Sequence, residues 1–222
     1  MIAAAGHSEV RSRLLDVLDA AARKTLVSRL HRREYKRGQV VFNDGDIGDY
    51  MHLLQRGRVD EEMMTLDGHV VSLRVVQPGQ FFGELALVHP NSRRLGRARA
   101  LEPTETLVLY RRDFDELRLH SPSVDRFLVT ALAERVTSTS RLVVELIRPP
   151  ESRLWRQLAM LADAYGGEPI RMSQDELAHT AGTARQTANR VLAEGVRRGI
   201  LTVDRCAIRV LDRASIDQMI NE

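Results

Sequence analysis

The sequence holds very little cysteine and no long apolar run. Cys206 is the only cysteine among 222 residues, so neither a disulfide nor a four-cysteine iron–sulfur site can form within the chain. No apolar stretch approaches the ~20 residues that a membrane-spanning helix needs. The first ten residues lack the basic start and apolar stretch of a secretion signal. These absences favour a cytoplasmic protein without membrane contacts.

The sequence also lacks the short motifs of common catalytic sites. It contains no H-E-x-x-H, no P-loop, no nucleophile elbow and no dinucleotide-binding fingerprint. The seven histidines are scattered, and their spacing does not suggest a set of metal ligands. We therefore expect no catalytic residues and no metal site, and the chain is not expected to be an enzyme.

Lysine is scarce, and arginine supplies nearly all the positive charge. The formal net charge is only +3, but residues 185–213 hold seven arginines against three acids. Such an excess suits contacts to phosphates. Arginine is the dominant base throughout, however, since Lys24 and Lys36 are the only lysines. The arginine cluster alone is therefore weak evidence for phosphate contacts, and it is informative only together with the motif that it surrounds.

That motif lies between residues 173 and 200 and predicts two short helices joined by a turn. Ser173 and Glu176 form an S-x-x-E capping box, which begins a helix. Gly182 suits the left-handed position that ends a helix. Thr183 and Gln186 predict a second capping box, and the second helix is expected to run to about Gly195. The first helix should turn its small apolar residues inward: Leu177, Ala178 and Ala181.

The second helix separates into two faces at roughly 100° per residue. One side is small and apolar, with Ala184, Thr187, Ala188, Val191 and Leu192. The other side carries Arg185, Gln186, Asn189 and Arg190 within about 140°. Forked or paired donors of this kind read guanine and adenine in the major groove. The alternative is an ordinary amphipathic helix on a protein surface.

The rest of the chain changes its periodicity twice. Residues 8–30 have helical spacing and predict one or two short helices. Residues 34–110 hold short β-branched runs separated by glycines, which are typical of a β-sandwich or small barrel. Examples are Gln39–Phe42, Val70–Val76 and Thr106–Tyr110.

A long helix is predicted to begin at Pro122 and to end before Pro149 and Pro150. Its stripe has the 4-3-4-3-4 spacing of a coiled-coil seam and consists of Leu128, Leu132, Arg135, Thr139, Leu142 and Leu146. The alternative is a helix buried against its own domain. After the proline pair, a helix from Glu151 leads into the two-helix motif. Ile200–Val203 and Ala207–Leu211 then alternate like a small hairpin, the wing of a winged helix-turn-helix.

The two-helix segment resembles the helix-turn-helix of the Crp/Fnr (cyclic-AMP receptor protein) family of bacterial transcription regulators. The family motif R-E-T-V-x-R matches Arg185 to Arg190, with both arginines in place and Gln186 replacing the acidic residue. A carboxylate accepts from cytosine, whereas glutamine suits adenine. The family's usual half-site is therefore not expected at that position, and Gln186 reads no base if it caps its own helix. The resemblance implies DNA contacts from Thr183, Arg185, Gln186, Asn189 and Arg190.

A second stretch resembles the family's phosphate-binding cassette for cyclic nucleotides. The resemblance implies a ligand site at Gly83, Glu84, Leu85, Arg94 and Leu95, in which Glu84 accepts from a ribose hydroxyl and Arg94 donates to the phosphate. Leu95 stands where the family has serine or threonine, and Gly96 and Arg97 also depart from the pattern. The alternative is a Glu84–Arg94 ion pair that fills an empty pocket. Ser138 and Thr139 resemble the family's adenine-contacting pair, or form a polar patch on the long helix.

The resemblance covers about residues 10–215 and implies an α+β fold in three segments. Residues 1–121 form a sensor, an N-terminal double-stranded β-helix (the cyclic-nucleotide-binding β-roll) with N-terminal helices. Residues 122–148 form a long dimerisation helix, and residues 149–222 form a C-terminal winged helix-turn-helix.

The expected partners are a pseudo-palindromic operator in double-stranded DNA, a second copy of the chain and RNA polymerase. Cyclic AMP is the expected effector; the alternative is a nucleotide-independent DNA-binding protein whose β-roll is a scaffold or senses another ligand. The lone cysteine excludes the family's cluster-bearing, oxygen-sensing branch.

Overall fold

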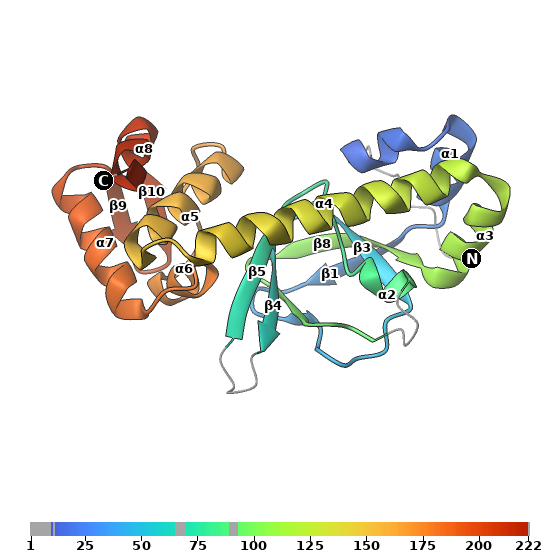
Figure 1. The fold of residues 1–222 in the computed structure, drawn as a ribbon, viewed down its shortest axis with the longest axis horizontal. Helices are drawn as coiled ribbons and strands as arrows, with labels where there is room; N and C mark the ends of the chain where they lie inside the picture. Colours follow the sequence, from blue (N-terminus) through green and yellow to red (C-terminus); the bar gives the residue numbers. More distant parts are fainter. Residues whose placement is uncertain (1–9, 11, 65–69, 89–92, 222) are drawn as a thin grey trace. The chain divides into compact units, whose positions relative to one another are not determined.

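The computed structural model describes residues 10, 12–64, 70–88 and 93–221 (Figure 1). The chain divides into two compact units, Met1–Val59 with Val76–Thr137, and Asp60–Val75 with Ser138–Glu222. The first unit begins with a short 3-10 helix, Arg13–Val17, and helix α1, Ala20–Ser28. The expectation of one or two short helices before residue 30 is confirmed for the described residues.

Two four-stranded sheets form the β-roll. One sheet has the order β1-β8-β3-β6 and comprises β1 (His31–Tyr35), β8 (Thr104–Tyr110), β3 (Tyr50–Arg56) and β6 (Phe81–Phe82). The other has the order β2-β7-β4-β5 and comprises β2 (Val40–Phe42), β7 (Arg97–Ala100), β4 (Val59–Met64) and β5 (Val70–Val76). β8 pairs antiparallel with both β1 and β3. The predicted strand segments are confirmed, and Gly38, Gly45, Gly57 and Gly79 have the positive φ typical of turn glycines. Gly68 lies outside the described residues.

Side chains on the two faces of strand β3 belong to two separate hydrophobic clusters, because successive side chains of a strand point to opposite faces. Met51 and Leu53 point to a cluster that also holds residues of the surrounding helices, such as Leu26 and Phe127. Leu54, on the opposite face, joins a second cluster with residues of both sheets: Phe42, Val59, Val76, Phe82 and Ala98. Both faces of this strand are therefore buried, which fixes its register.

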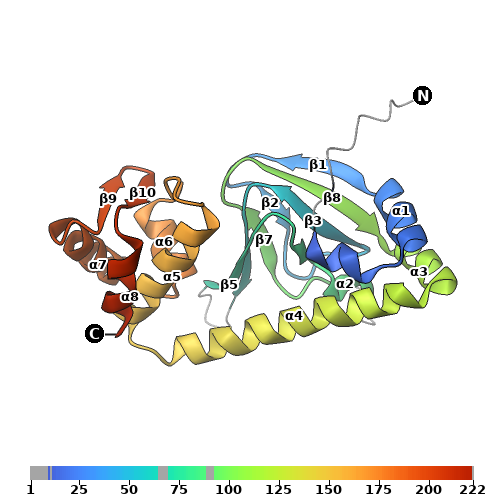
Figure 2. The same cartoon turned by 90° about the horizontal axis from the view of Figure 1, so that it is seen from above.

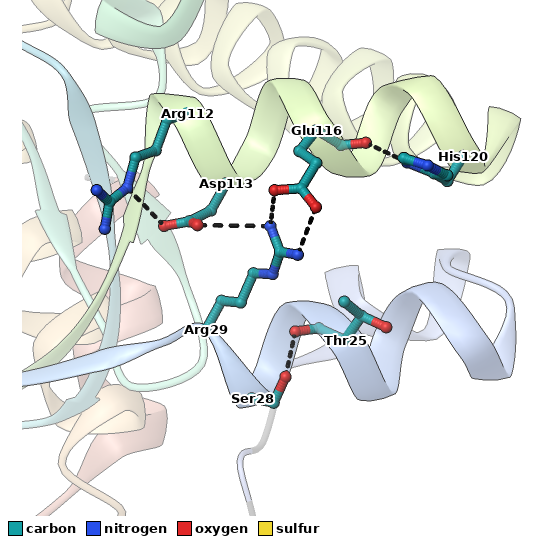
Figure 3. Close-up of polar contacts among 7 residues, drawn as sticks. All are labelled: Thr25, Ser28, Arg29, Arg112, Asp113, Glu116 and His120. Atoms are coloured by element: carbon teal, nitrogen blue, oxygen red, sulfur yellow. Dashed lines mark hydrogen bonds and ion pairs between the residues drawn. The ribbon is translucent and has the colours of Figure 1, made fainter.

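Helices α3 (Arg111–His120) and α1 lie side by side near the start of α4 (Pro122–Leu146), as Figures 1 and 2 show. Between α1 and α3 lies a cleft of about 360 Å³. Figure 3 shows Arg29, which follows α1, reaching both carboxylate oxygens of Glu116 at 2.6 and 2.7 Å. This hydrogen bond holds the pKa of Glu116 below its ordinary value. The paired geometry fixes the two helices together.

Helix α4 has the predicted extent, but its predicted seam is partly wrong. Leu128 is buried in the core of the first unit, and Leu132 packs partly against that core. The exposed apolar stripe is displaced by one residue and repeats every seven positions at Val129, Val136 and Val143, whose exposed fractions are 64%, 65% and 59%. Residues in the first two turns of the helix, Leu128 among them, are buried against their own unit. The apolar stripe that stays exposed therefore lies on another face of the helix and begins at Val129.

The second unit ends in the winged helix-turn-helix predicted from the sequence. Pro150 is the first residue of α5 (Pro150–Ala164), where its missing N–H costs no helical hydrogen bond. Helices α6 (Gln174–Thr180) and α7 (Arg185–Arg197) follow, then the antiparallel hairpin of β9 (Leu201–Asp204) and β10 (Ala207–Val210), and α8 (Arg213–Asn221). Ser173 and Glu176 form the predicted capping box, and Gly182 has a φ of +59°.

Candidate nucleic-acid interface and effector site

Helix α7 presents the predicted donors on its exposed side. Arg185, Gln186, Asn189 and Arg190 are exposed, whereas Ala188, Val191 and Leu192 are buried. The apolar residues pack against the rest of the second unit, and this packing orients the polar face outward. The expected separation of the helix into two faces is confirmed at these positions, although Ala184 is exposed.

The predicted second capping box is wrong. The N-cap of α7 is Ala184, and no side chain caps this end of the helix. Thr183 is partly buried, and its hydroxyl donates to the Ala178 carbonyl at 3.4 Å. The predicted N-cap was therefore one residue too early: the helix begins at Arg185, and Gln186 lies inside its first turn. Gln186 does not cap the helix, and its amide faces solvent.

Two exposed ion pairs hold the arginines of this face. Arg185 Nε lies 3.0 Å from Asp175 Oδ1, and Arg190 pairs with Glu151 at the start of α5. All four side chains are more than half exposed. Pairs of this kind contribute little to stability, at most about 1 kcal/mol. The arginines can therefore exchange their carboxylates for other acceptors at small cost.

Gly195 brings α7 close to its neighbours. A Cβ at this position would lie 2.8 Å from Leu201 Cδ2 on β9 and 3.0 Å from Trp155 Cη2 on α5. Only glycine permits this approach, which fixes α7 between the wing and α5. The sequence pattern indicated Gly195 only as the approximate end of the helix, because a close packing contact leaves no local signal.

Arg94 of the candidate effector site is buried and turned inward. Its guanidinium donates to the carbonyls of Gly83 at 2.8 Å and Tyr50 at 2.7 Å, and lies 4.2 Å from the centre of the Phe42 ring. Glu84 is also buried, and Leu85 begins the short helix α2, Leu85–Val88. The cassette thus brings Gly83, Glu84, Leu85 and Arg94 together.

Gly83 has a φ of +73°, and a Cβ there would lie 2.5 Å from an Arg94 guanidinium nitrogen. The glycine therefore makes room for the arginine in this conformation. Leu95 is 46% exposed and faces away from the core. Ser138 is partly buried and Thr139 is exposed on α4, in the second unit.

His52 is an uncharged neighbour of this site. Its ring stacks on Phe82 at 4.6 Å between centroids, and its Nδ1 lies 3.0 Å from the Thr106 hydroxyl. Burial holds the pKa of His52 well below its ordinary value, and the charges of Arg94 and Arg33 lower it further. The positive charge among these residues therefore belongs to Arg94 and not to the histidine. No motif in the sequence indicated that His52 would lie beside the candidate effector site.

The structure also assembles a group that the sequence did not indicate. Asp60 and Glu62 on β4 lie beside His179 on α6, with all three ligand atoms within 4.8 Å of one another. Because more than one hundred residues separate His179 from the two acids, a search for local motifs could not find this group.

Among the described residues, no helix is both long and apolar enough to cross a membrane.

Two family models match the chain. The model described as "Cyclic nucleotide-binding domain" matches residues 32–121, and the "Crp-like helix-turn-helix domain" matches residues 152–219. The cyclic AMP receptor protein of Thermus thermophilus is 30% identical over 197 residues, which cover 87% of this chain and 89% of the relative. The CRP-like cAMP-activated global transcriptional regulator of Mycobacterium tuberculosis is 27% identical and covers 91% and 93%.

Solved structures support the same fold. A CRP/FNR-family regulator from Thermus thermophilus has a TM-score of 0.72 at 23% identity, covering 86% of this chain and 99% of the other. The c-di-GMP-responsive regulator CLP of Xanthomonas campestris has a TM-score of 0.73 at 22% identity, with the same coverage. Sequence matches, element order and the helix-turn-helix agree: the chain belongs to the CRP/FNR family of transcription regulators, with a cyclic-nucleotide-binding domain and a helix-turn-helix DNA-binding domain.

Proposed function

We propose that this protein is a homodimeric, sequence-specific regulator that reads DNA through α7. The observation that carries this proposal is the exposed face of Arg185, Gln186, Asn189 and Arg190 opposite a buried apolar face. Arginine recognises guanine, and the amides of glutamine and asparagine recognise adenine. We propose that Thr183, just before the helix, contacts the DNA backbone. Transcriptional control through such a site further implies contact with RNA polymerase.

Arg190 tests the reading of bases. On a DNA site selected by the wild-type protein, Arg190→Ala should raise Kd about 5- to 150-fold and relax discrimination at one base pair. Arg197→Ala, at the far end of the same helix, is the matched control and should leave base preference unchanged. Fluorescence anisotropy with selected and scrambled duplexes measures both effects. An equal loss for Arg190→Ala on both duplexes would show contact with phosphate alone.

The dimer is supported by the stripe on α4. Val129, Val136 and Val143 repeat at the seven-residue spacing of a coiled coil and stay exposed in the single chain. A second copy of the same helix would bury them and would place two α7 helices for a pseudo-palindromic operator, whose half-sites lie one helical turn apart.

We further propose that an anionic effector, cyclic AMP in the first instance, binds at Gly83, Glu84, Leu85 and Arg94. The Arg94 guanidinium donates to the Gly83 and Tyr50 carbonyls, and a phosphate at the same fork would accept a charge-assisted hydrogen bond from it. Leu95 cannot supply the hydroxyl that the family places there, so fewer donors surround the phosphate. Ser138 and Thr139 of the long helix would meet the base.

Calorimetric titration with cyclic AMP, cyclic GMP and cyclic di-GMP tests this proposal. Binding of cyclic AMP should be lost in Arg94→Lys, which keeps the charge but not the fork. The exposed neighbour Arg93 provides the control, Arg93→Lys, which should bind normally. If no nucleotide gives heat and DNA affinity is unchanged by any of them, the β-roll is a scaffold or senses another ligand.

A further inference from the structure

Asp60, Glu62 and His179 converge in the second unit. Asp60 and Glu62 are two residues apart on β4, so their side chains share a face of the strand, while Glu61 points to the other. His179 Nε2 lies 3.5 Å from Asp60 Oδ2 and 3.4 Å from Glu62 Oε1. Both carboxylates are buried, with exposed fractions of 0% and 1%.

The distances fit ligands around a shared ion better than direct hydrogen bonds. Charged N–H···O pairs favour about 2.7–2.9 Å, well below both separations. Two ligand atoms bound to Zn²⁺ at about 2.0–2.1 Å with tetrahedral angles lie about 3.4 Å apart. The histidine nitrogen stands at this separation from two different carboxylates at once.

A second contact orients one of the carboxylates. The Ser72 hydroxyl on β5 donates to Asp60 Oδ1 at 2.5 Å, which directs Oδ2, the other oxygen, toward His179. Outer partners of this kind set the orientation of metal ligands. Glu61 is engaged elsewhere, because Arg74 Nε lies 2.5 Å from its carboxylate.

We propose that Asp60, Glu62 and His179 bind a divalent transition-metal ion of the Zn²⁺ type. One imidazole and two carboxylates are a ligand set that zinc accepts, with water completing the coordination. Because His179 belongs to the first helix of the helix-turn-helix, the ion would tie β4 to the DNA-binding motif.

Zn²⁺ and Co²⁺ are the probes for calorimetry on the full chain after removal of bound metal with a chelator. A Cys206→Ser background removes the exposed thiol as a competing ligand. We expect one ion per chain, with the visible absorption of tetrahedral Co²⁺. Affinity should fall at least tenfold in Glu62→Gln and in His179→Gln. Glu61→Gln, on the opposite face of the same strand, is the matched control and should bind as the parent does.

Thermal melting provides a second readout that does not depend on DNA. Zn²⁺ should raise the Tm of the parent and of Glu61→Gln, but not that of His179→Gln. An absence of binding by the parent, or equal binding by His179→Gln, would overturn the metal site and leave a histidine–carboxylate ion pair.

The link to regulation rests on the proposed DNA binding and is tested separately. Affinity for the selected DNA should differ with and without Zn²⁺ in Glu61→Gln but not in His179→Gln. If the ion binds and this affinity is unchanged, the link is refuted while the site remains. If DNA does not bind at all, the proposed function fails independently of the calorimetry.

Discussion

Asp19 joins two helices through a single carboxylate. It caps α1 by accepting from the Ala22 amide at 2.8 Å, and it accepts hydrogen bonds from the Ser121 and Ser123 hydroxyls at the start of α4 at 2.5 and 2.8 Å. The Ala22 bond, followed by those of the serines, lowers the pKa of Asp19 to about 2. This carboxylate is therefore a specific acid-sensitive contact in the first unit.

The pH dependence of stability follows from the direction of this shift. The ordinary pKa of the group is 3.8, so its contribution is complete above about pH 4 and is lost as the pH falls toward 2. Asp19→Asn should lower the Tm at pH 7 and should flatten the decline of Tm between pH 4 and pH 2. Melting curves followed by circular dichroism measure both. Parallel declines in wild type and variant would contradict this account.

For single residues, the sequence predicted which side chains carry the functional groups better than it predicted how those side chains are oriented. The exposure of Arg185, Gln186, Asn189 and Arg190 follows from a period that the sequence displays. The inward turn of Arg94 does not follow, because its carbonyl partners come from positions far along the chain. The assembly of Asp60, Glu62 and His179 was missed for the same reason.

At the element scale, α4 shows where periodicity alone was insufficient. Leu128 and Val129 are adjacent and both apolar, so the sequence offers two stripes about 100° apart. Packing against the first unit takes Leu128 inward and leaves Val129, Val136 and Val143 outside. The choice between the stripes depends on which face the β-roll covers, and that is a tertiary property.

The exposed stripe makes a direct prediction about assembly. Val136→Asp places a charge in its centre and should shift the protein toward monomer at micromolar concentration, because two carboxylates would be buried in the interface. Arg141→Asp introduces the same side chain about 140° around the helix and should leave the assembly intact. Sedimentation velocity distinguishes the species. A dimer that survives Val136→Asp would place the interface elsewhere.

At the scale of the whole molecule, the order of parts was predictable from the sequence. Glycine-separated strands predicted a β-sandwich or small barrel, and one long helix was predicted between Pro122 and Pro149. The pattern of residues 173–200 predicted two short helices, and the resemblance to the Crp/Fnr family implied the β-roll and the winged helix-turn-helix. The start of α7 was displaced, because Thr183 and Gln186 match a capping box that the chain does not form. A short capping motif indicates that a helix begins nearby, but it locates the first helical residue only to within one or two positions.

In the proposed function, two copies of α7 read bases in one DNA site. Selection from a random duplex library with the wild-type protein, followed by sequencing, tests it most directly. We expect an enriched pseudo-palindrome with half-sites about 10 base pairs apart and an adenine at the position read by Gln186. Recovery of DNA without any shared motif, or of the same motif by a protein with Arg185, Gln186, Asn189 and Arg190 all changed to alanine, would contradict it.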